Sequence, residues 1–71
     1  MSDFLVELEI EVLAVTDTSI KVQVADVEEP VWLPKSEIDE EQSELDPNAC
    51  EEGDSGMIHI PEWLAVDRGL V

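Results

Sequence analysis

The sequence has few residues of the kinds that cross-link a fold or bind anions. It has one cysteine (Cys50), one histidine (His59), no tyrosine and three basic residues among 71. One cysteine excludes an intramolecular disulfide, and together with one histidine it cannot supply a zinc site. No apolar run approaches the ~20 residues that span a membrane. The N-terminus has no basic region before an apolar stretch, so we expect no signal peptide and a cytoplasmic protein.

Patterns typical of catalytic and metal sites are also missing. There is no Gly-rich phosphate loop and no credible Ser/His/Asp or Cys/His set. His59 lies between two isoleucines, as expected for a structural histidine, and the carboxylates near Cys50 should raise the pKa of its thiol. The acidic runs 39–41 and 51–54 lack the ligand spacing of an EF-hand. We therefore expect a non-enzymatic protein with no metal and no other cofactor.

The charge is strongly one-sided. Nineteen Asp and Glu face only Lys21, Lys35 and Arg68, which gives a formal net charge of −16. Small designed domains carry a net charge of roughly 2–8 in magnitude. Nucleic acid and anionic membranes are poor partners for such a surface, whereas a basic protein surface is a good one. General solubility, adaptation to high salt and a disordered acidic tail are the alternatives, and 44% hydrophobic residues argues against disorder.

The first strand carries the clearest pattern in the chain. Residues 4–15 read FLVELEIEVLAV and alternate strictly from position 6 to position 12. A period of two predicts a half-buried β-strand whose side chains point alternately to the core and to solvent. The core side comprises Val6, Leu8, Ile10 and Val12, and the solvent side comprises Glu7, Glu9 and Glu11.

Three further strands follow at 20–24, 31–33 and 57–60. The polar turn 16–19 joins the first two strands as a β-hairpin, and the acidic turn 26–30 leads to the third. We expect the four strands to form a small antiparallel sheet that curls like a half-barrel.

A helix over 61–68 should close the fold and cover one face of the sheet. Pro61 suits the first helical position, and Gly69 suits the left-handed residue that ends a helix. Because aromatic residues are scarce, we expect Trp32 and Trp63 to be core residues. The apolar side of this helix comprises Trp63, Leu64 and Val66.

The segment 37–56 is an acidic insert before the last strand. Ser36 with Asp39 resembles a capping box that would open a short helix over 37–45, and an ordered acidic loop is the equal alternative. The expected fold class is therefore α+β, with one domain over 1–71.

The acidic residues form the candidate partner-binding surface. Alternate residues of a strand lie about 6.6–6.8 Å apart, close to two axial steps between phosphates of one DNA strand at ~3.4 Å each. A row of glutamates on a rigid strand would therefore present negative charge at intervals like those of DNA, and an acidic face that only maintains solubility is the alternative. The candidate residues are Glu7, Glu9, Glu11, Glu28, Glu29, Glu37, Asp39, Glu40, Glu41 and Glu44.

Two stretches resemble small phage and prophage proteins. They are the sequence VWLPKS at 31–36 and the sequence IPEWLA at 60–65, the latter followed by Gly69-Leu70. The resemblance implies a phage origin, a host bacterial cell as the location and a small β-rich fold. It implies no activity by itself.

In size and charge alone, the chain is also similar to small acidic phage proteins that act as DNA mimics, including anti-CRISPR proteins. This resemblance implies an inhibitor that blocks target DNA binding by a type I CRISPR surveillance complex, or binds another basic DNA-binding protein. The alternative is a non-enzymatic phage accessory module that docks on a replication or recombination protein through its sheet edge or Trp32. We expect a monomer or a weak dimer.

Overall fold

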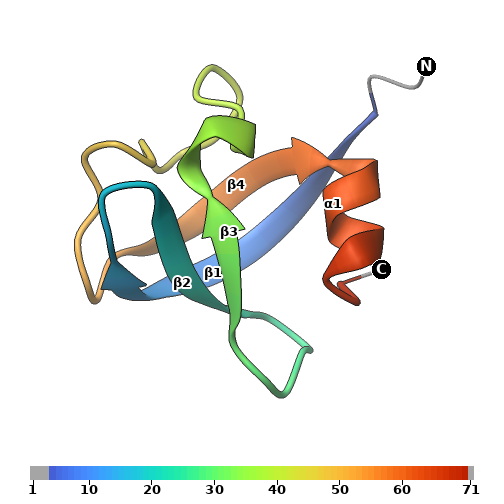
Figure 1. Cartoon of the computed structure of the whole chain (residues 1–71), viewed down its shortest axis with the longest axis horizontal. Helices are drawn as coiled ribbons and strands as arrows, with labels where there is room; N and C mark the ends of the chain where they lie inside the picture. The colour runs from blue at the N-terminus through green and yellow to red at the C-terminus, as the bar shows by residue number, and fades with distance from the viewer. Residues whose placement is uncertain (1–3, 71) are drawn as a thin grey trace.

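Strand β1, Leu5–Val15, runs through the interior of the sheet and pairs on both sides (Figure 1). The computed structural model describes residues 4–70. The other strands are β2, Ser19–Val24, β3, Val31–Pro34, and β4, Ser55–Pro61, in the order β3-β2-β1-β4 with every pairing antiparallel. The predicted α+β class and the four predicted strands are confirmed, each strand boundary within one or two residues.

The inner face of the sheet forms the core. Leu8, Ile10 and Val12 of β1 are buried there, as their alternation with the glutamates predicts. Burying one such side chain stabilises the fold by about 1.5–3 kcal/mol relative to leaving it exposed. The core residues of the other strands are Ile20, Val22, Val24, Leu33, Ile58 and Ile60.

A β-bulge in β1 accompanies the curl of the sheet. Val12 pairs with Val22, but Ala14 pairs with Lys21, so β1 has one extra residue at Leu13. An extra residue bends its strand and increases the local twist. In Figure 1, β3 crosses in front of β1 and β4. As a result, the outer surfaces of β1 and β3 lie on opposite sides of the molecule.

Helix α1, Glu62–Asp67, packs at one end of the sheet and is shorter than the predicted helix over 61–68. Gly69, just beyond the C-cap residue Arg68, has the left-handed φ of 72° that glycine adopts without steric cost. The Leu70 amide then donates to the Ala65 carbonyl at 2.8 Å, the long bond of a Schellman motif. Within residues 4–70, no helix is long and apolar enough to cross a membrane.

The predicted helix over 37–45 is wrong. A single 3-10 turn, η1, spans Lys35–Glu37, and a loop follows, as in the alternative interpretation of this segment. Asp39 explains the difference, because its Oδ1 accepts hydrogen bonds from the amides of Glu41, at 2.9 Å, and Gln42, at 3.1 Å. Such bonds from a side chain to the local backbone favour a turn over a helix.

The same loop covers the outer edge of β4. The Asp39 amide donates to the His59 carbonyl at 2.9 Å, and the Glu44 amide donates to the Met57 carbonyl at 2.8 Å. The His59 amide in turn donates to the Ser43 hydroxyl at 2.8 Å. This edge is therefore already paired and does not offer a free row of backbone groups to another chain.

We predict that Ile60→Ala strongly destabilises the protein, because Ile60 is fully buried in the core beside β1. The expected loss is about 2–5 kcal/mol, a large part of the roughly 4–10 kcal/mol available to a domain of this size. Urea denaturation followed by circular dichroism measures it. Val66→Ala is the matched control, since Val66 is exposed and alanine favours a helix. Equal losses in both variants would contradict the assignment of the core.

Candidate functional site

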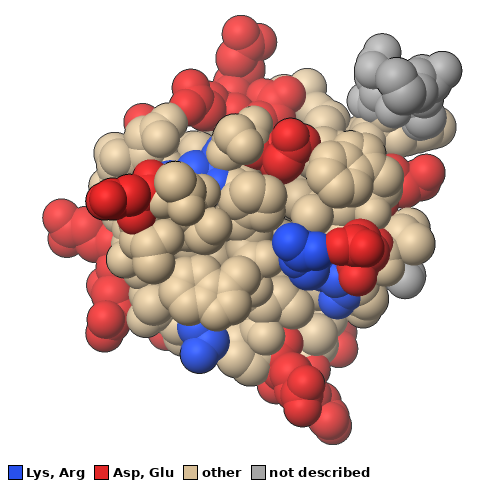
Figure 2. All heavy atoms as spheres, viewed as in Figure 1, with Lys and Arg blue, Asp and Glu red and all other residues tan. Residues whose placement is uncertain are grey.

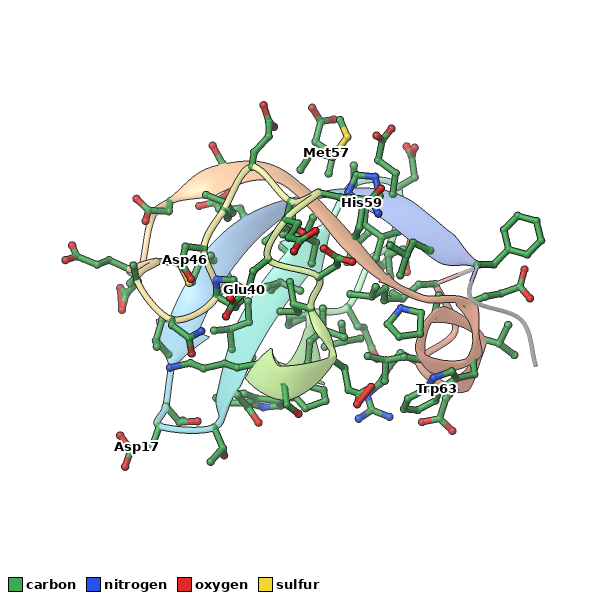
Figure 3. All side chains as sticks on the ribbon, turned by 90° about the horizontal axis from the view of Figure 1, so that it is seen from above. Asp17, Glu40, Asp46, Met57, His59 and Trp63 are labelled. Carbon is green, nitrogen blue, oxygen red and sulfur yellow. The ribbon has the colours of Figure 1, made fainter. Side chains whose placement is uncertain are left out.

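The outer face of β1 carries a row of three carboxylates, which we call the glutamate row: Glu7, Glu9 and Glu11. All three side chains are exposed. Their partners on β4 are His59, Met57 and Ser55 in turn, so this face continues onto β4. Figure 3 shows Met57 and His59 on one side of the molecule, with several carboxylates beside them. The structure therefore brings the three glutamates together on one open surface.

Glu7 is the one member of the row that lies within ion-pair distance of a basic side chain among residues 4–70. Its Oε2 lies 3.4 Å from His59 Nε2, which makes an ion pair only when the histidine is protonated. Between residues 4 and 70, no ion pair joins Glu9 or Glu11 to a basic side chain. The row thus presents carboxylates whose charge is not neutralised by Lys or Arg of the same molecule.

The remaining candidate acids lie on other elements, and the loop after η1 brings Asp39 and Glu44 next to β4. Glu28 and Glu29 are exposed in the connection between β2 and β3. In the loop after η1, Glu44 Oε1 accepts from the Met57 amide at 2.9 Å, and Glu40 accepts from the Asn48 side chain. Asp39 bonds the backbone of its own turn, as described above. Several acids of the predicted second patch therefore also hold the loop in place. The other two candidates there are Glu37, partly buried, and Glu41, exposed.

The basic side chains lie on a different face. Figure 2 shows Lys and Arg side chains within a largely uncharged surface, with carboxylates around its rim. Arg68 lies here: its Nε donates to the Trp32 carbonyl at 3.0 Å, and its guanidinium pairs with Asp67. These contacts attach the end of α1 to β3.

The two tryptophans are not core residues, so that prediction is wrong. Trp32 is 43% exposed and Trp63 is 58% exposed. In β3, Leu33 pairs with the core residue Ile20, and alternation then turns Trp32 outward. In α1, Leu64 and Ala65 face the core and Trp63 does not. The sequence held a signal for this: if Val31 and Leu33 point inward in a strand, Trp32 between them points outward.

Cys50 is a buried residue of the loop between η1 and β4, and its Sγ lies 3.8 Å from the Pro47 carbonyl. Burial raises the pKa of the thiol, and the carboxylates of Asp54 and Asp46 add to the rise. The sequence correctly predicted that the pKa of Cys50 is raised, but burial contributes more to the rise than the nearby carboxylates do. Among residues 4–70, no group of three or more His, Cys, Asp or Glu side chains is placed to hold a metal ion.

Comparisons of the chain with models of protein families, with curated proteins and with solved structures find no match. The functional argument therefore depends on the geometry and charge described above.

We predict that Cys50 reacts slowly with iodoacetamide in the folded protein, because burial disfavours its thiolate. Since the pKa is raised, the rate should stay low at neutral pH and rise only at higher pH than for an unfolded chain. Reaction in urea should be faster by about tenfold or more, as expected for an exposed thiol with the usual pKa. Mass spectrometry of the alkylated protein measures both rates.

The control for this experiment is Cys50→Ser combined with Ser55→Cys, which places an exposed thiol beside the same acidic loop. It should react faster than Cys50 in the folded state. If this thiol reacts as slowly as Cys50, negative charge and not burial controls the reactivity.

Proposed function

We propose that this protein is an inhibitor that acts as a DNA mimic, binding the basic groove of a DNA-binding protein through the glutamate row. The observation that carries the proposal is the exposure of Glu7, Glu9 and Glu11 on one strand face, without Lys or Arg partners for Glu9 and Glu11 in the described residues. A groove lined by Lys and Arg attracts such a row and steers its approach from a distance.

The spacing and the rigidity of the row support this proposal. Alternate side chains of a strand are about 6.6–6.8 Å apart, near two axial phosphate steps of ~3.4 Å each. Hydrogen bonds to β2 and β4 hold the backbone of β1 from both sides. Binding therefore requires the ordering of side chains only, which lowers the entropy cost of association.

The target that we propose is a type I CRISPR surveillance complex in the cytoplasm of a host bacterium. CRISPR effector complexes hold guide and target strands in a positively charged channel, which is the kind of surface that the row fits. The phage resemblance of the sequence and its formal net charge of −16 support the same assignment.

The test is displacement of labelled target DNA from a purified type I complex. We predict that the wild-type protein displaces the DNA at low salt and does so less well as salt screens the charges. Replacing Glu7, Glu9 and Glu11 by Gln should weaken displacement by about tenfold or more, as for several lost charge contacts. Fluorescence anisotropy of the DNA measures the effect.

The matched control replaces Asp17, Glu51 and Glu52 by Asn or Gln, which changes the net charge equally at exposed sites outside the row. An equal loss in the control would show that net charge alone matters, against the role of the row. If the wild type displaces no DNA even at low salt, the anti-CRISPR assignment fails.

A pull-down from a nuclease-treated host lysate, eluted with a salt gradient, then tests whether the target is another basic DNA-binding protein. A basic DNA-binding protein captured by the control but not by the row variant supports mimicry.

A second candidate function is a non-enzymatic phage accessory module that binds a replication or recombination protein. The exposure of Trp32 favours it. Docking by strand addition is not favoured, because the loop pairs with the β4 edge and β3 is a short strand that follows Pro30 and ends at Pro34. Binding of this kind would persist at high salt and would be lost in Trp32→Ala.

A further inference from the structure

Three exposed apolar side chains and one arginine lie where the end of α1 contacts β3. We call this group the tryptophan patch and define it as Trp32, Trp63, Val66 and Arg68. Trp32 is 43% exposed, Trp63 58% and Val66 60%. Tryptophan and arginine are among the residues most enriched at the energetic centres of protein interfaces. Both tryptophans leave about half of their surface in solvent, so core packing alone does not account for them here.

The fold holds the two elements that carry these four residues together. The bond of 3.0 Å from Arg68 Nε to the Trp32 carbonyl holds the end of α1 against β3. Trp63 and Val66 are three residues apart in α1 and are therefore neighbours on the helix surface. Figure 3 places Trp63 on the side of the molecule opposite Met57 and His59, which neighbour the glutamate row. The patch and the row are thus separate surfaces.

The charge around the patch indicates what kind of partner it fits. In Figure 2, most carboxylates lie around the edge of this face, and its middle is mainly uncharged apart from basic side chains and the carboxylate of Asp67 that pairs with Arg68. Protein interfaces commonly have an apolar centre with aromatic anchors and a polar rim. We propose that the tryptophan patch is a docking surface for a partner protein that has an apolar socket with a rim of Lys and Arg.

A second copy of this chain fits the patch less well. In a symmetric dimer built on this face, the acidic rim of one copy would meet the acidic rim of the other. Each copy carries a formal net charge of −16, and juxtaposed like charges oppose association. A partner with a basic rim converts the same carboxylates into favourable contacts. The proposal is independent of the glutamate row and would give the protein two binding faces.

Tryptophan fluorescence reports on the patch directly, because Trp32 and Trp63 are the two tryptophans of the chain. The probe is an amphipathic helical peptide of ~18 Leu and Lys residues, long enough to form a helix on binding. We predict that it shifts the emission to shorter wavelength and stays bound at about 1 M salt, where charge attraction is largely screened. A Lys/Ser peptide of equal charge should bind at low salt only and leave the emission unchanged.

Single substitutions then locate the contact, and the remaining tryptophan reports binding in each variant. Trp32→Ala and Trp63→Ala should each weaken binding of the Leu/Lys peptide by about tenfold or more. The matched control is Val15→Ala, because Val15 is exposed but lies outside the patch. Circular dichroism checks the fold, and Trp32→Phe and Trp63→Phe, which retain an aromatic ring, serve where an alanine variant does not fold. These should bind the peptide within a few fold of wild type.

Two outcomes would overturn the proposal. One is that the Leu/Lys peptide causes no shift, or that the tryptophan variants bind it as well as Val15→Ala does. The other is that the protein alone shows the shift as its concentration rises, because the patch would then be occupied by a second copy. Replacing the glutamate row by Gln should leave the peptide-induced shift at high salt in place. Failure of the row hypothesis and failure of the patch hypothesis are therefore distinguishable.

Discussion

The pairing of β1 on both sides is the constraint on which the rest of the structure depends. Hydrogen bonds to β2 and β4 hold this strand in a register that buries Leu8, Ile10 and Val12. Because strand side chains alternate, a slip of one residue would turn the glutamates into the core and the apolar side chains into solvent. The burial of the inner face thus also determines that the glutamate row points outward as one surface.

A chain with a formal net charge of −16 must fold against its own repulsion. Part of its acidity contributes to the fold, because Asp39 and Glu44 accept hydrogen bonds from backbone amides of the loop and of β4. These bonds keep the acidic loop against the edge strand β4. The glutamate row is different, since its exposed carboxylates stabilise no part of the described structure beyond the contact between Glu7 and His59. That difference is why we propose the row as a binding surface.

The curl of the sheet separates two kinds of surface. The outer face of β1 bears the glutamate row, and the outer face of β3 bears Trp32 on the other side of the molecule (Figures 1 and 3). Charge attraction acts over a Debye length, about 8 Å at physiological salt, whereas apolar burial requires contact. Under the two proposals above, binding at the glutamate row would weaken as salt rises, whereas binding at the tryptophan patch would persist.

The local sequence determined the strands and the C-terminal helix, because alternation and helix-ending residues depend only on residues close together in the chain. The alternation in β1 predicted both the strand and its acidic face, and Gly69 predicted the end of α1. Only the tertiary structure decided which segments pack against each other and which side chains that packing buries. The helix over 37–45 did not form because Asp39 bonds its own backbone and the loop pairs with β4. Trp32 and Trp63 are exposed because smaller side chains fill the interior of the curled sheet, and the number of places in a core depends on how all its elements pack.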